Sequence, residues 1–217
     1  MSRRVLLLRH GRTAWNAERR YQGQADPPLD DVGRAQAYEV AALVALLRPA
    51  VIVSSDASRS MQTATPLGEI AGLPVHVDPR LRERSLGHWE GLTRDEVAQR
   101  YPDEFADWLD GRDVSRRGGE TRQQVADRAR AVFDELPDVE LSVLVTHSAT
   151  AMALCAELLG LSQERHVLGP LANCHWSELR CEQNGAVRWQ LRAHNAGPPG
   201  PVIPRLAVEE DAPDAQA

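Results

Sequence analysis

The chain contains no lysine, and all 25 of its basic residues are arginine. Without lysine the protein cannot form a Schiff base with a substrate, and it cannot use the phosphate-binding loop in which a lysine contacts a nucleotide. A phosphate site in this chain must therefore be built from guanidinium groups, which keep their charge and offer a planar fork of donors.

Cysteine and long apolar runs are also scarce. Cys155, Cys174 and Cys181 are widely spaced and form no CxxC pair, so we expect free thiols rather than disulfides or a metal site. Near the N-terminus the apolar run Val5–Leu8 is too short for a signal peptide or a membrane span. These features predict a cytoplasmic protein without membrane contact.

The net charge of −6 argues against a general nucleic-acid binder, which would normally carry a basic face. It does not exclude small anionic substrates, because a local group of arginines decides the potential of a pocket. A chain of 217 residues can bury a substantial core as one domain. We therefore expect a small-molecule partner and no nucleic acid.

Short apolar runs alternate with segments of helical periodicity along most of the chain. The predicted strands are Val5–Leu8, Val51–Val53, Val75–Val77, Leu141–Val145 and a closing antiparallel pair, His175–Cys181 and Val187–Ala193, around the turn Asn184-Gly185. The predicted helices are Val32–Leu47, Ser58–Ala71, Arg94–Arg100, Glu104–Leu109, Thr121–Leu136 and Ala149–Leu159. This order predicts an α/β fold, a three-layer sandwich with a mostly parallel central sheet and helices on both faces.

The domain organisation follows from composition. Residues 1–195 are expected to form a single domain, and 196–217, where Pro, Gly and acidic residues dominate, a disordered tail. A lid-like insertion at about 91–120 carries or adjoins many aromatic and basic residues: Trp89, Tyr101, Phe105, Trp108, Arg94, Arg112, Arg116 and Arg117. Two interpretations stay open. The aromatic side chains pack short helices onto the sheet beside solvated arginines, or they form a lid that stacks on a sugar while the arginines bind a carboxylate.

Two histidines follow apolar strands directly, at the edge where parallel sheets bind ligands. These are His10, which follows Arg9, and His147; Arg59 comes shortly after the second predicted strand. If the strands are neighbours, two histidines and two arginines meet in one crevice. Such a set suits phosphoryl transfer, because guanidinium groups bind phosphate oxygens and a neutral imidazole is a competent nucleophile.

Transfer to a histidine also needs an acid that protonates the leaving oxygen, and Glu83 is the candidate. A competing hypothesis is a metal site made of His10, His147, Glu83 and Asp56. The chain has no HxH, HxxxH or HExxH spacing, and the arginines would repel a cation, so we expect no metal and no cofactor. A serine hydrolase is disfavoured because GxSxG is absent.

A series of short motifs runs through the chain. They are Leu8-Arg9-His10-Gly11-Arg12-Thr13, Asn16, Gln22-Gly23, Pro28-Leu29-Asp30, Gly33, Gln36-Ala37, Ser54-Ser55-Asp56, Arg59, Gln62-Thr63-Ala64, Leu81-Arg82-Glu83, Gly87-His88-Trp89-Glu90-Gly91, Gly118-Gly119-Glu120-Thr121 and Val145-Thr146-His147. In this order the set closely resembles the histidine phosphatase superfamily, which includes the cofactor-dependent phosphoglycerate mutases. The resemblance implies a phosphoglycerate mutase-like fold and a metal-independent phosphomonoester phosphatase with a phosphohistidine intermediate.

The resemblance also implies roles for single residues. His10 would be the nucleophile and Glu83 the proton donor and later the base; Arg9, Arg59 and His147 would bind the phosphate, and the substrate-binding residues would be Asn16, Gln22, Gly23 and Ser148. Ser148 stands where the family usually has glycine. A left-handed backbone would strain a serine there, whereas a helix N-cap or first-turn position would suit it, and we favour the second case.

The substrate is less constrained than the reaction. The compact stretch from Glu83 to His147 and the predicted disordered tail favour a phosphatase over a phosphoglycerate mutase, and a catalytically weak relative that binds phosphorylated ligands is a further alternative. Segments Arg80–Glu83 and Leu171–Trp176 are similar to actinobacterial members of the family, including glucosyl-3-phosphoglycerate phosphatases. That sugar-acid phosphate is the leading substrate hypothesis, with other sugar phosphates open. A homodimer is common in the family.

Overall fold

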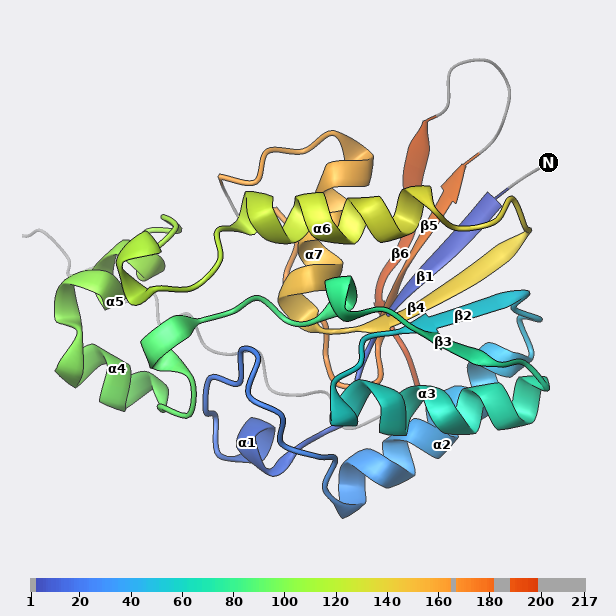
Figure 1. Cartoon of the computed structure of the whole chain (residues 1–217), viewed down its shortest axis with the longest axis horizontal. Coiled ribbons are helices and arrows are strands. Elements are labelled where there is room, and N and C mark those ends of the chain that lie inside the picture. The colour runs from blue at the N-terminus through green and yellow to red at the C-terminus, as the bar shows by residue number, and fades with distance from the viewer. Residues whose placement is uncertain (1–2, 165–166, 182–187, 199–217) are drawn as a thin grey trace, which may run out of the picture.

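The computed structural model describes residues 3–164, 167–181 and 188–198. Six strands form one sheet in the order β3-β2-β4-β1-β5-β6 (Figure 1). They are β1 Arg3–Arg9, β2 Val51–Ser54, β3 Val75–Val77, β4 Leu141–Thr146, β5 Trp176–Cys181 and β6 Trp189–Ala196. The first four strands in the sheet order run parallel to one another. Strand β5 pairs antiparallel with β1 on one side and with β6 on the other. The predicted mostly parallel sheet is confirmed.

Helices cover both faces of this sheet. They are α1 Ala14–Ala17, α2 Asp31–Ala45, α3 Ser58–Ala71, α4 Arg94–Arg100, α5 Pro102–Leu109, α6 Arg122–Asp134 and α7 Ser148–Leu159, with short 3₁₀ turns at Pro79–Leu81, Gly87–Trp89 and Ser115–Arg117. On one face β1 contributes Leu6 and Leu8 to a core shared with α2 and α3. On the other it contributes Val5 and Leu7 to a core shared with α6 and α7. This alternation produces the three-layer sandwich.

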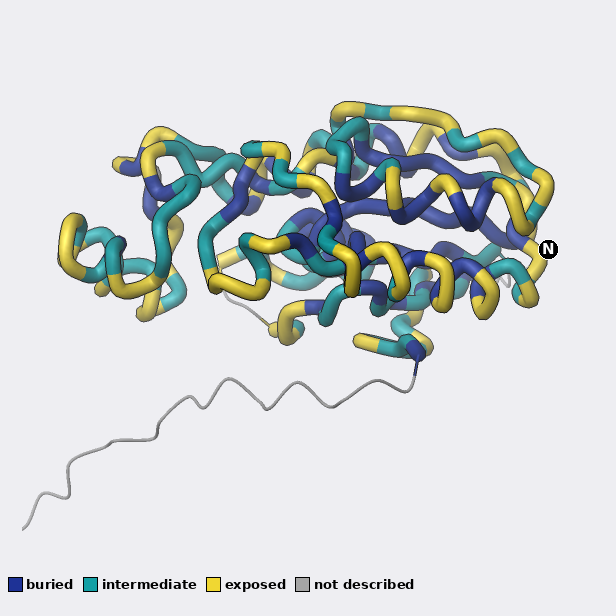
Figure 2. The backbone as a smooth tube through the Cα atoms, turned by 90° about the horizontal axis from the view of Figure 1, so that it is seen from below, coloured by how far each residue is buried: buried dark blue, intermediate teal, exposed yellow. Residues whose placement is uncertain are grey.

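The central strands are apolar on both faces because both faces are covered. Leu6, Leu7 and Leu8 are completely buried, and the strands form the buried interior between more exposed helices in Figure 2. Each such side chain contributes about 1.5–3 kcal/mol of transfer free energy. Burial on two sides therefore explains why short continuous apolar runs, rather than alternating patterns, marked these strands.

The differences from the sequence-based expectations are local. Helix α1 lies in a stretch where no helix was predicted, because its four residues bury none of their side chains and leave no apolar periodicity. A capping box between Thr13 and Asn16 stabilises it instead. Strand β6 continues to Ala196. The predicted turn Asn184-Gly185 and most of the predicted tail, 199–217, lie outside the described residues.

Segment 91–120 projects from one end of the sandwich, at the left of Figure 1, and has a small apolar core of its own. Completely buried Trp89 and Val97 lie at its centre, and Tyr21 and Trp108 pack around them. The aromatic side chains therefore cluster with one another rather than packing the short helices onto the sheet. The lid function of this segment stays a prediction.

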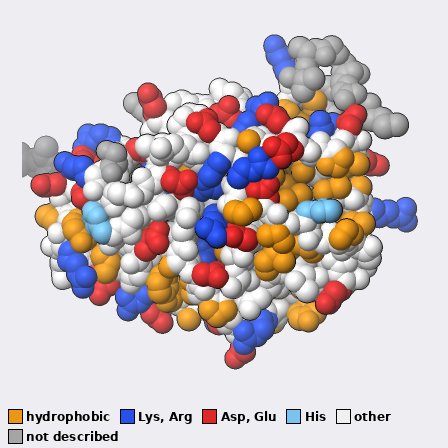
Figure 3. Space-filling view, in the orientation of Figure 1, with side chains coloured by type: hydrophobic (Ala, Val, Ile, Leu, Met, Phe, Trp, Pro, Cys, Tyr) orange, Lys and Arg blue, Asp and Glu red, His pale blue; other side chains and the backbone are white. Residues whose placement is uncertain are grey.

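Three further expectations concern the surface charge, the cysteines and membrane-spanning helices. Arginine side chains lie beside acidic ones on the face shown in Figure 3, so this face has no broad basic patch. Cys155, Cys174 and Cys181 are free and buried. Within the described part of the chain, no helix combines the length and apolar character needed to cross a membrane.

Two glycines bring the start of α2 against the loop that follows β1. A Cβ atom on Gly33 would lie 1.9 Å from the carbonyl oxygen of Arg12, and one on Gly11 would lie 2.6 Å from the carbonyl oxygen of Gly33. Both obstacles are backbone atoms, which cannot rotate away. The loop that carries His10 is thus held by a backbone contact that tolerates no side chain.

We expect Gly33→Ala to lower the free energy of unfolding by about 1–3 kcal/mol, because the added methyl group must displace the loop backbone. Gly169→Ala is the matched control, since a Cβ atom there meets nothing within 4 Å. Urea denaturation of both variants measures the difference. Equal stabilities would show that the loop shifts at no cost.

Candidate active site

The sheet order places three loops side by side. Strand β4 lies between β1 and β2, and the ends of all three meet at one edge of the sheet. The amide of His10 donates to the carbonyl of Thr146 at 3.0 Å, and the amide of Ser55 donates to the carbonyl of Val145 at 2.9 Å. The three strands are therefore neighbours, which is the condition stated for the two histidines and two arginines to meet in one crevice.

A cavity of about 180 Å³ opens at this edge. Its lining combines residues of the three loops with residues near the projecting segment: Arg9, His10, Asn16, Arg20, Tyr21, Gln22, Gly23, Arg59, Glu83, Arg84, Leu86 and Ala149. Seven of the nine predicted site residues are among them, and His147 and Ser148 are not.

His10 is buried, and its Nδ1 lies 2.7 Å from the carbonyl oxygen of Gly11. A carbonyl oxygen can only accept, so Nδ1 carries the proton and Nε2 keeps its lone pair. Burial, followed by the positive charges of Arg9 and Arg59, holds the pKa of His10 well below its usual value. His10 is therefore a neutral imidazole with a free nitrogen in the cavity wall.

Arg59 is buried and Arg9 is half-buried, and the two side chains lie near each other. Arg59 donates to the carbonyl oxygens of Ala25 at 2.7 Å and Gly23 at 3.0 Å, and Arg9 donates to the carbonyl of Leu171. The Nε of Arg9 is buried without a hydrogen-bond partner in the described structure. Burial lowers the pKa of both guanidinium groups. A bound anion would relieve this cost and accept the free donors.

His147 lies behind His10 rather than in the cavity lining. Its ring centroid is 5.1 Å from that of His10, and the side chain is completely buried. Nδ1 accepts a hydrogen bond from Arg59 Nε at 3.3 Å, so Nε2 carries the proton and donates to Ser55 Oγ at 3.1 Å. Burial and then Arg59 hold the pKa of His147 well below its usual value. In this arrangement His147 supports Arg59 and His10.

Glu83 is bound at the first turn of α7. Its carboxylate accepts from the amides of Ala149 and Thr150, each at 3.2 Å, and from the amide of Arg84 at 2.8 Å. Arg128 on α6 fixes the same loop, because its guanidinium donates to the carbonyl oxygens of residues 80, 82 and 83. The acid is thus positioned by the layer of α6 and α7, whereas Arg59 belongs to α3 on the other face.

The four predicted substrate-binding residues differ in placement. Asn16 and Gln22 line the cavity; Asn16 Oδ1 accepts from Thr13, which leaves the amide nitrogen available, and Gln22 Oε1 is buried without a partner among the described residues. Gly23 has φ +51° and its carbonyl binds Arg59. Ser148 begins α7, and its hydroxyl accepts from the amide of Leu171 at 3.1 Å.

Ser148 therefore occupies a first-turn position. It is not among the residues with positive φ, so the serine is unstrained there. Its hydroxyl holds the loop whose Leu171 carbonyl binds Arg9, which places Ser148 one contact away from the cavity. The role of each of these residues toward a substrate stays a prediction.

The metal hypothesis finds no support in the side-chain arrangement. Among the residues that the structure describes, no group of three or more His, Cys, Asp or Glu side chains is placed to hold an ion. Asp56, one of the candidate ligands, instead binds Arg82 through both carboxylate oxygens, with Nε to Oδ1 at 2.8 Å. The buried guanidinium groups suit an anion rather than a cation.

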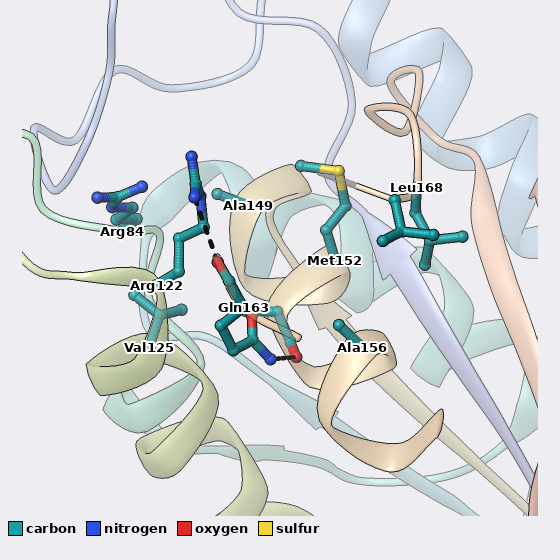
Figure 4. A pocket seen from close by; sticks show the side chains of 10 residues that line it. Arg84, Arg122, Val125, Ala149, Met152, Ala156, Gln163 and Leu168 are labelled. Carbon is teal, nitrogen blue, oxygen red and sulfur yellow. Dashed lines mark hydrogen bonds between the residues drawn. The ribbon is translucent and has the colours of Figure 1, made fainter. Parts of the chain in front are cut away.

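A second cleft lies between α6 and α7 and shares Arg84 and Ala149 with the first cavity (Figure 4). Its lining is mostly apolar and includes Val125, Met152 and Leu168. Two of its polar side chains bind nearby backbone: Arg122 donates to the carbonyl of Gln163, and the side chain of Gln163 donates to the carbonyl of Ala153. It offers no nucleophile, so the chemistry belongs to the first cavity.

Sequence reasoning missed several contributors. Arg128 and Thr150 hold Glu83, and Ser55 and Ser60 lie against His147, yet each sits within an ordinary helix or strand-end pattern. Their role depends on contacts between segments far apart in the chain. Two of the sequence motifs were the available signals: Ser54-Ser55-Asp56 contains Ser55, and Gly118-Gly119-Glu120-Thr121 contains Glu120, which binds Arg128 at 2.8 Å.

Comparison with known proteins agrees with this geometry. Residues 5–196 match the family described as histidine phosphatase superfamily (branch 1). A glucosyl-3-phosphoglycerate phosphatase from Mycolicibacterium vanbaalenii is 40% identical, over 89% of this chain and 95% of the relative. A probable phosphoglycerate mutase from Yersinia pestis is 35% identical, over 83% of this chain and 86% of the relative.

Comparison with solved structures finds similar folds among phosphatases. The structure of mycobacterial glucosyl-3-phosphoglycerate phosphatase complexed with VO₃ has a TM-score of 0.83 and 38% identity, and covers 90% of this chain and 100% of that chain. An α-ribazole phosphatase from Shigella flexneri has a TM-score of 0.77 at 26% identity, over 89% of this chain and 96% of that chain.

We expect the free energy of unfolding to fall as the pH drops below about 6.5, because the unfolded chain takes up protons that the buried histidines exclude. Each such proton contributes a slope of about 1.4 kcal/mol per pH unit until the folded pKa is reached. The unfolded chain of His10→Gln takes up one proton fewer, so the free energy of unfolding should fall less steeply with pH below 6.5.

Denaturation curves of wild type and His10→Gln between about pH 5 and 7, at constant ionic strength, measure this difference. His76→Gln, on an exposed histidine of β3, is the control and should keep the wild-type slope. Identical slopes for wild type and His10→Gln would contradict a neutral buried His10.

Proposed function

Because the chain belongs to the histidine phosphatase superfamily (branch 1), we propose that it is a metal-independent phosphomonoester phosphatase that forms a phosphohistidine on His10. The observation that carries the proposal is the hydrogen bond from His10 Nδ1 to the Gly11 carbonyl, which frees Nε2 beside Arg9 and Arg59. A neutral nitrogen nucleophile next to two guanidinium groups suits attack on a phosphate ester.

In the first step, the lone pair of His10 Nε2 attacks phosphorus and the bond from phosphorus to the ester oxygen breaks. Arg9 and Arg59 bind the phosphate oxygens, and the amide of Asn16 and the side chain of Gln22 add hydrogen bonds from the same cavity. Protonated Glu83 gives its proton to the leaving oxygen, which departs as an alcohol. His147 keeps Arg59 and His10 in place through the contacts described above.

In the second step, Glu83 acts as the base. Its carboxylate takes a proton from water, the water oxygen attacks phosphorus, and the bond from phosphorus to Nε2 breaks, which restores neutral His10 and releases phosphate. A polar cavity of about 110 Å³, lined by Gln24, Asp26 and Arg82 among others, meets the first cavity at Arg59 and Glu83. It offers a path by which this water reaches the carboxylate.

The substrate proposal rests on the relatives. The 40% identical protein is a glucosyl-3-phosphoglycerate phosphatase, which favours a phosphorylated sugar acid and hydrolysis over phosphoryl return to the substrate. A phosphoglycerate mutase is the alternative, because a probable mutase is 35% identical. The unstrained Ser148 removes the main argument for a catalytically weak relative. A cytoplasmic location, a homodimer and a lid role for 91–120 complete the proposal.

We expect His10→Ala to lose turnover by more than about 1,000-fold, as removal of a nucleophile usually does. The assay is phosphate release in EDTA from p-nitrophenyl phosphate, 3-phosphoglycerate, sugar phosphates and glucosyl-3-phosphoglycerate. His76→Ala, on the edge strand β3, is the control and should match wild type. The substrate that is hydrolysed best identifies the physiological substrate class. Equal release by His10→Ala and wild type would rule out His10 as the nucleophile.

The role of Glu83 has its own signature. Glu83→Gln should slow hydrolysis of alkyl phosphates by about 100-fold or more, because their leaving oxygen needs a proton, and should slow phosphoenzyme formation from p-nitrophenyl phosphate far less. Rapid-quench measurement of the phosphoenzyme separates this step from its hydrolysis. If both ester types lose the same factor in phosphoenzyme formation, Glu83 is not the proton donor.

A further inference from the structure

The cavity has a sheet-side wall and a wall next to the projecting segment 91–120. Arg9, His10, Arg59 and Glu83 form the first around the reacting phosphate. The second wall includes Arg20, Tyr21 and Arg84. Tyr21 packs in the aromatic core of segment 91–120, and Arg84 pairs with Asp113 in that segment. This wall faces whatever the phosphate is attached to.

Arg84 offers a donor on this wall. The residue is 5% exposed, and its Nε and Nη2 donate to the Glu120 carbonyl and to Asp113, at 2.8 and 2.7 Å. Its Nη1 makes no hydrogen bond with any described residue. Because its backbone amide binds the Glu83 carboxylate at 2.8 Å, Arg84 is held at a fixed place beside the acid.

Tyr21 offers a second donor. Its ring is packed against Trp89 and Trp108, with centroids 5.5 and 5.9 Å away, and its hydroxyl makes no hydrogen bond with the described residues. Burial raises the pKa of Tyr21 to about 12, so the hydroxyl keeps its proton at neutral pH. Arg20 lines the same wall but is already bound to Glu18, Glu96 and the Gly91 carbonyl.

Positive charge predominates behind this wall. Arg117 is 1% exposed, and its Nε and Nη1 are buried without hydrogen-bond partners in the described structure. Arg84 and Arg117 lie close together, because both donate to the Glu120 carbonyl, at 2.8 and 3.3 Å. Burial and then the charge of Arg84 lower the pKa of Arg117 to about 10. Two acids of this region are already paired, Asp113 with Arg84 at 2.7 Å and Glu120 with Arg128 at 2.8 Å. The wall therefore favours a negative group.

The exposed arginines of segment 91–120 do not serve this purpose. Arg112 binds Asp107 and Asp110, and Arg116 binds Asp107, at distances of 2.6–2.8 Å. Arg94 lies over the ring of Phe105. None of the three lines the cavity. The cavity wall therefore uses other arginines than those expected from the sequence of this segment.

We propose that Arg84 Nη1 and the Tyr21 hydroxyl form a carboxylate subsite that selects phosphate esters of hydroxy acids over phosphate esters of neutral alcohols. The inference rests on the proposed phosphatase function and extends it, since it names the residues that read the organic part of the substrate. A carboxylate bound there receives two donors, one of them charged, in a largely buried wall. The phosphate of the same molecule then lies against His10.

The test compares 3-phosphoglycerate with glycerol 3-phosphate, which differ in a carboxylate against a hydroxymethyl group. Wild type should favour the acid by about tenfold or more in kcat/KM, the difference expected for hydrogen bonds to a charged group. Arg84→Gln and Tyr21→Phe should each lower this preference by about tenfold. Tyr21→Phe removes only the hydroxyl and keeps the packed ring. It therefore tests the subsite even if Arg84→Gln disturbs folding.

Arg116→Gln is the matched control, because Arg116 is an exposed arginine of segment 91–120 that lies outside the cavity, and it should keep the wild-type preference. An unchanged preference in Tyr21→Phe and Arg84→Gln, or an equal loss in Arg116→Gln, overturns the subsite. If wild type hydrolyses no phosphate ester, including p-nitrophenyl phosphate, the phosphatase proposal fails. Calorimetric affinities of the same variants for the two compounds then decide the subsite separately.

Discussion

The burial of two guanidinium groups next to each other is the constraint on which the rest of the site depends. Arg9 and Arg59 repel each other, and a full carboxylate partner for each would cancel the attraction for a ligand. Their hydrogen bonds go instead to backbone carbonyls, those of Ala25 and Gly23 for Arg59 and that of Leu171 for Arg9. Arg59 also makes a long ion pair with exposed Asp26, 3.8 Å from Nη1 to Oδ1. Carbonyl dipoles offset part of the desolvation cost and leave the net positive charge for an anion.

This arrangement explains the irregular loops around the site. The turn at Gly23, with φ +51°, presents its carbonyl to Arg59, and Ser148 fixes the segment that presents the Leu171 carbonyl to Arg9. Glu83, the one carboxylate in the cavity wall, is drawn toward the first-turn amides of α7.

Sequence reasoning reached the centre of the site because that centre depends on strand ends. Arg9-His10 and His147 follow apolar strands, and the order of a parallel sheet brings such ends together whatever the details of packing. The strands themselves were predictable because burial on both faces leaves continuous apolar runs. Helix α1 was not, since a capping box rather than an apolar stripe stabilises it.

The outer parts of the site were out of reach for a different reason. Which arginine faces the cavity depends on how segment 91–120 folds on itself, and its acids Asp107 and Asp110 capture Arg112 and Arg116 while Arg84 keeps one nitrogen free. The position of Arg128 likewise follows from the packing of α6 on the loop of Glu83. Such choices are decided by tertiary contacts that no local pattern encodes.

The thiols have a bearing on how the protein would behave under oxidative stress. Cys174 donates its amide to the carbonyls of Arg9 and His10, so modification of its sulfur would disturb the site directly. Burial raises the pKa of Cys174 and of Cys155 to about 12, which keeps the reactive thiolate scarce. Peroxides and alkylating agents that inactivate phosphatases with a cysteine nucleophile would find neither a thiolate nor an open path here. With the proposed imidazole nucleophile, phosphate release would not depend on a thiol.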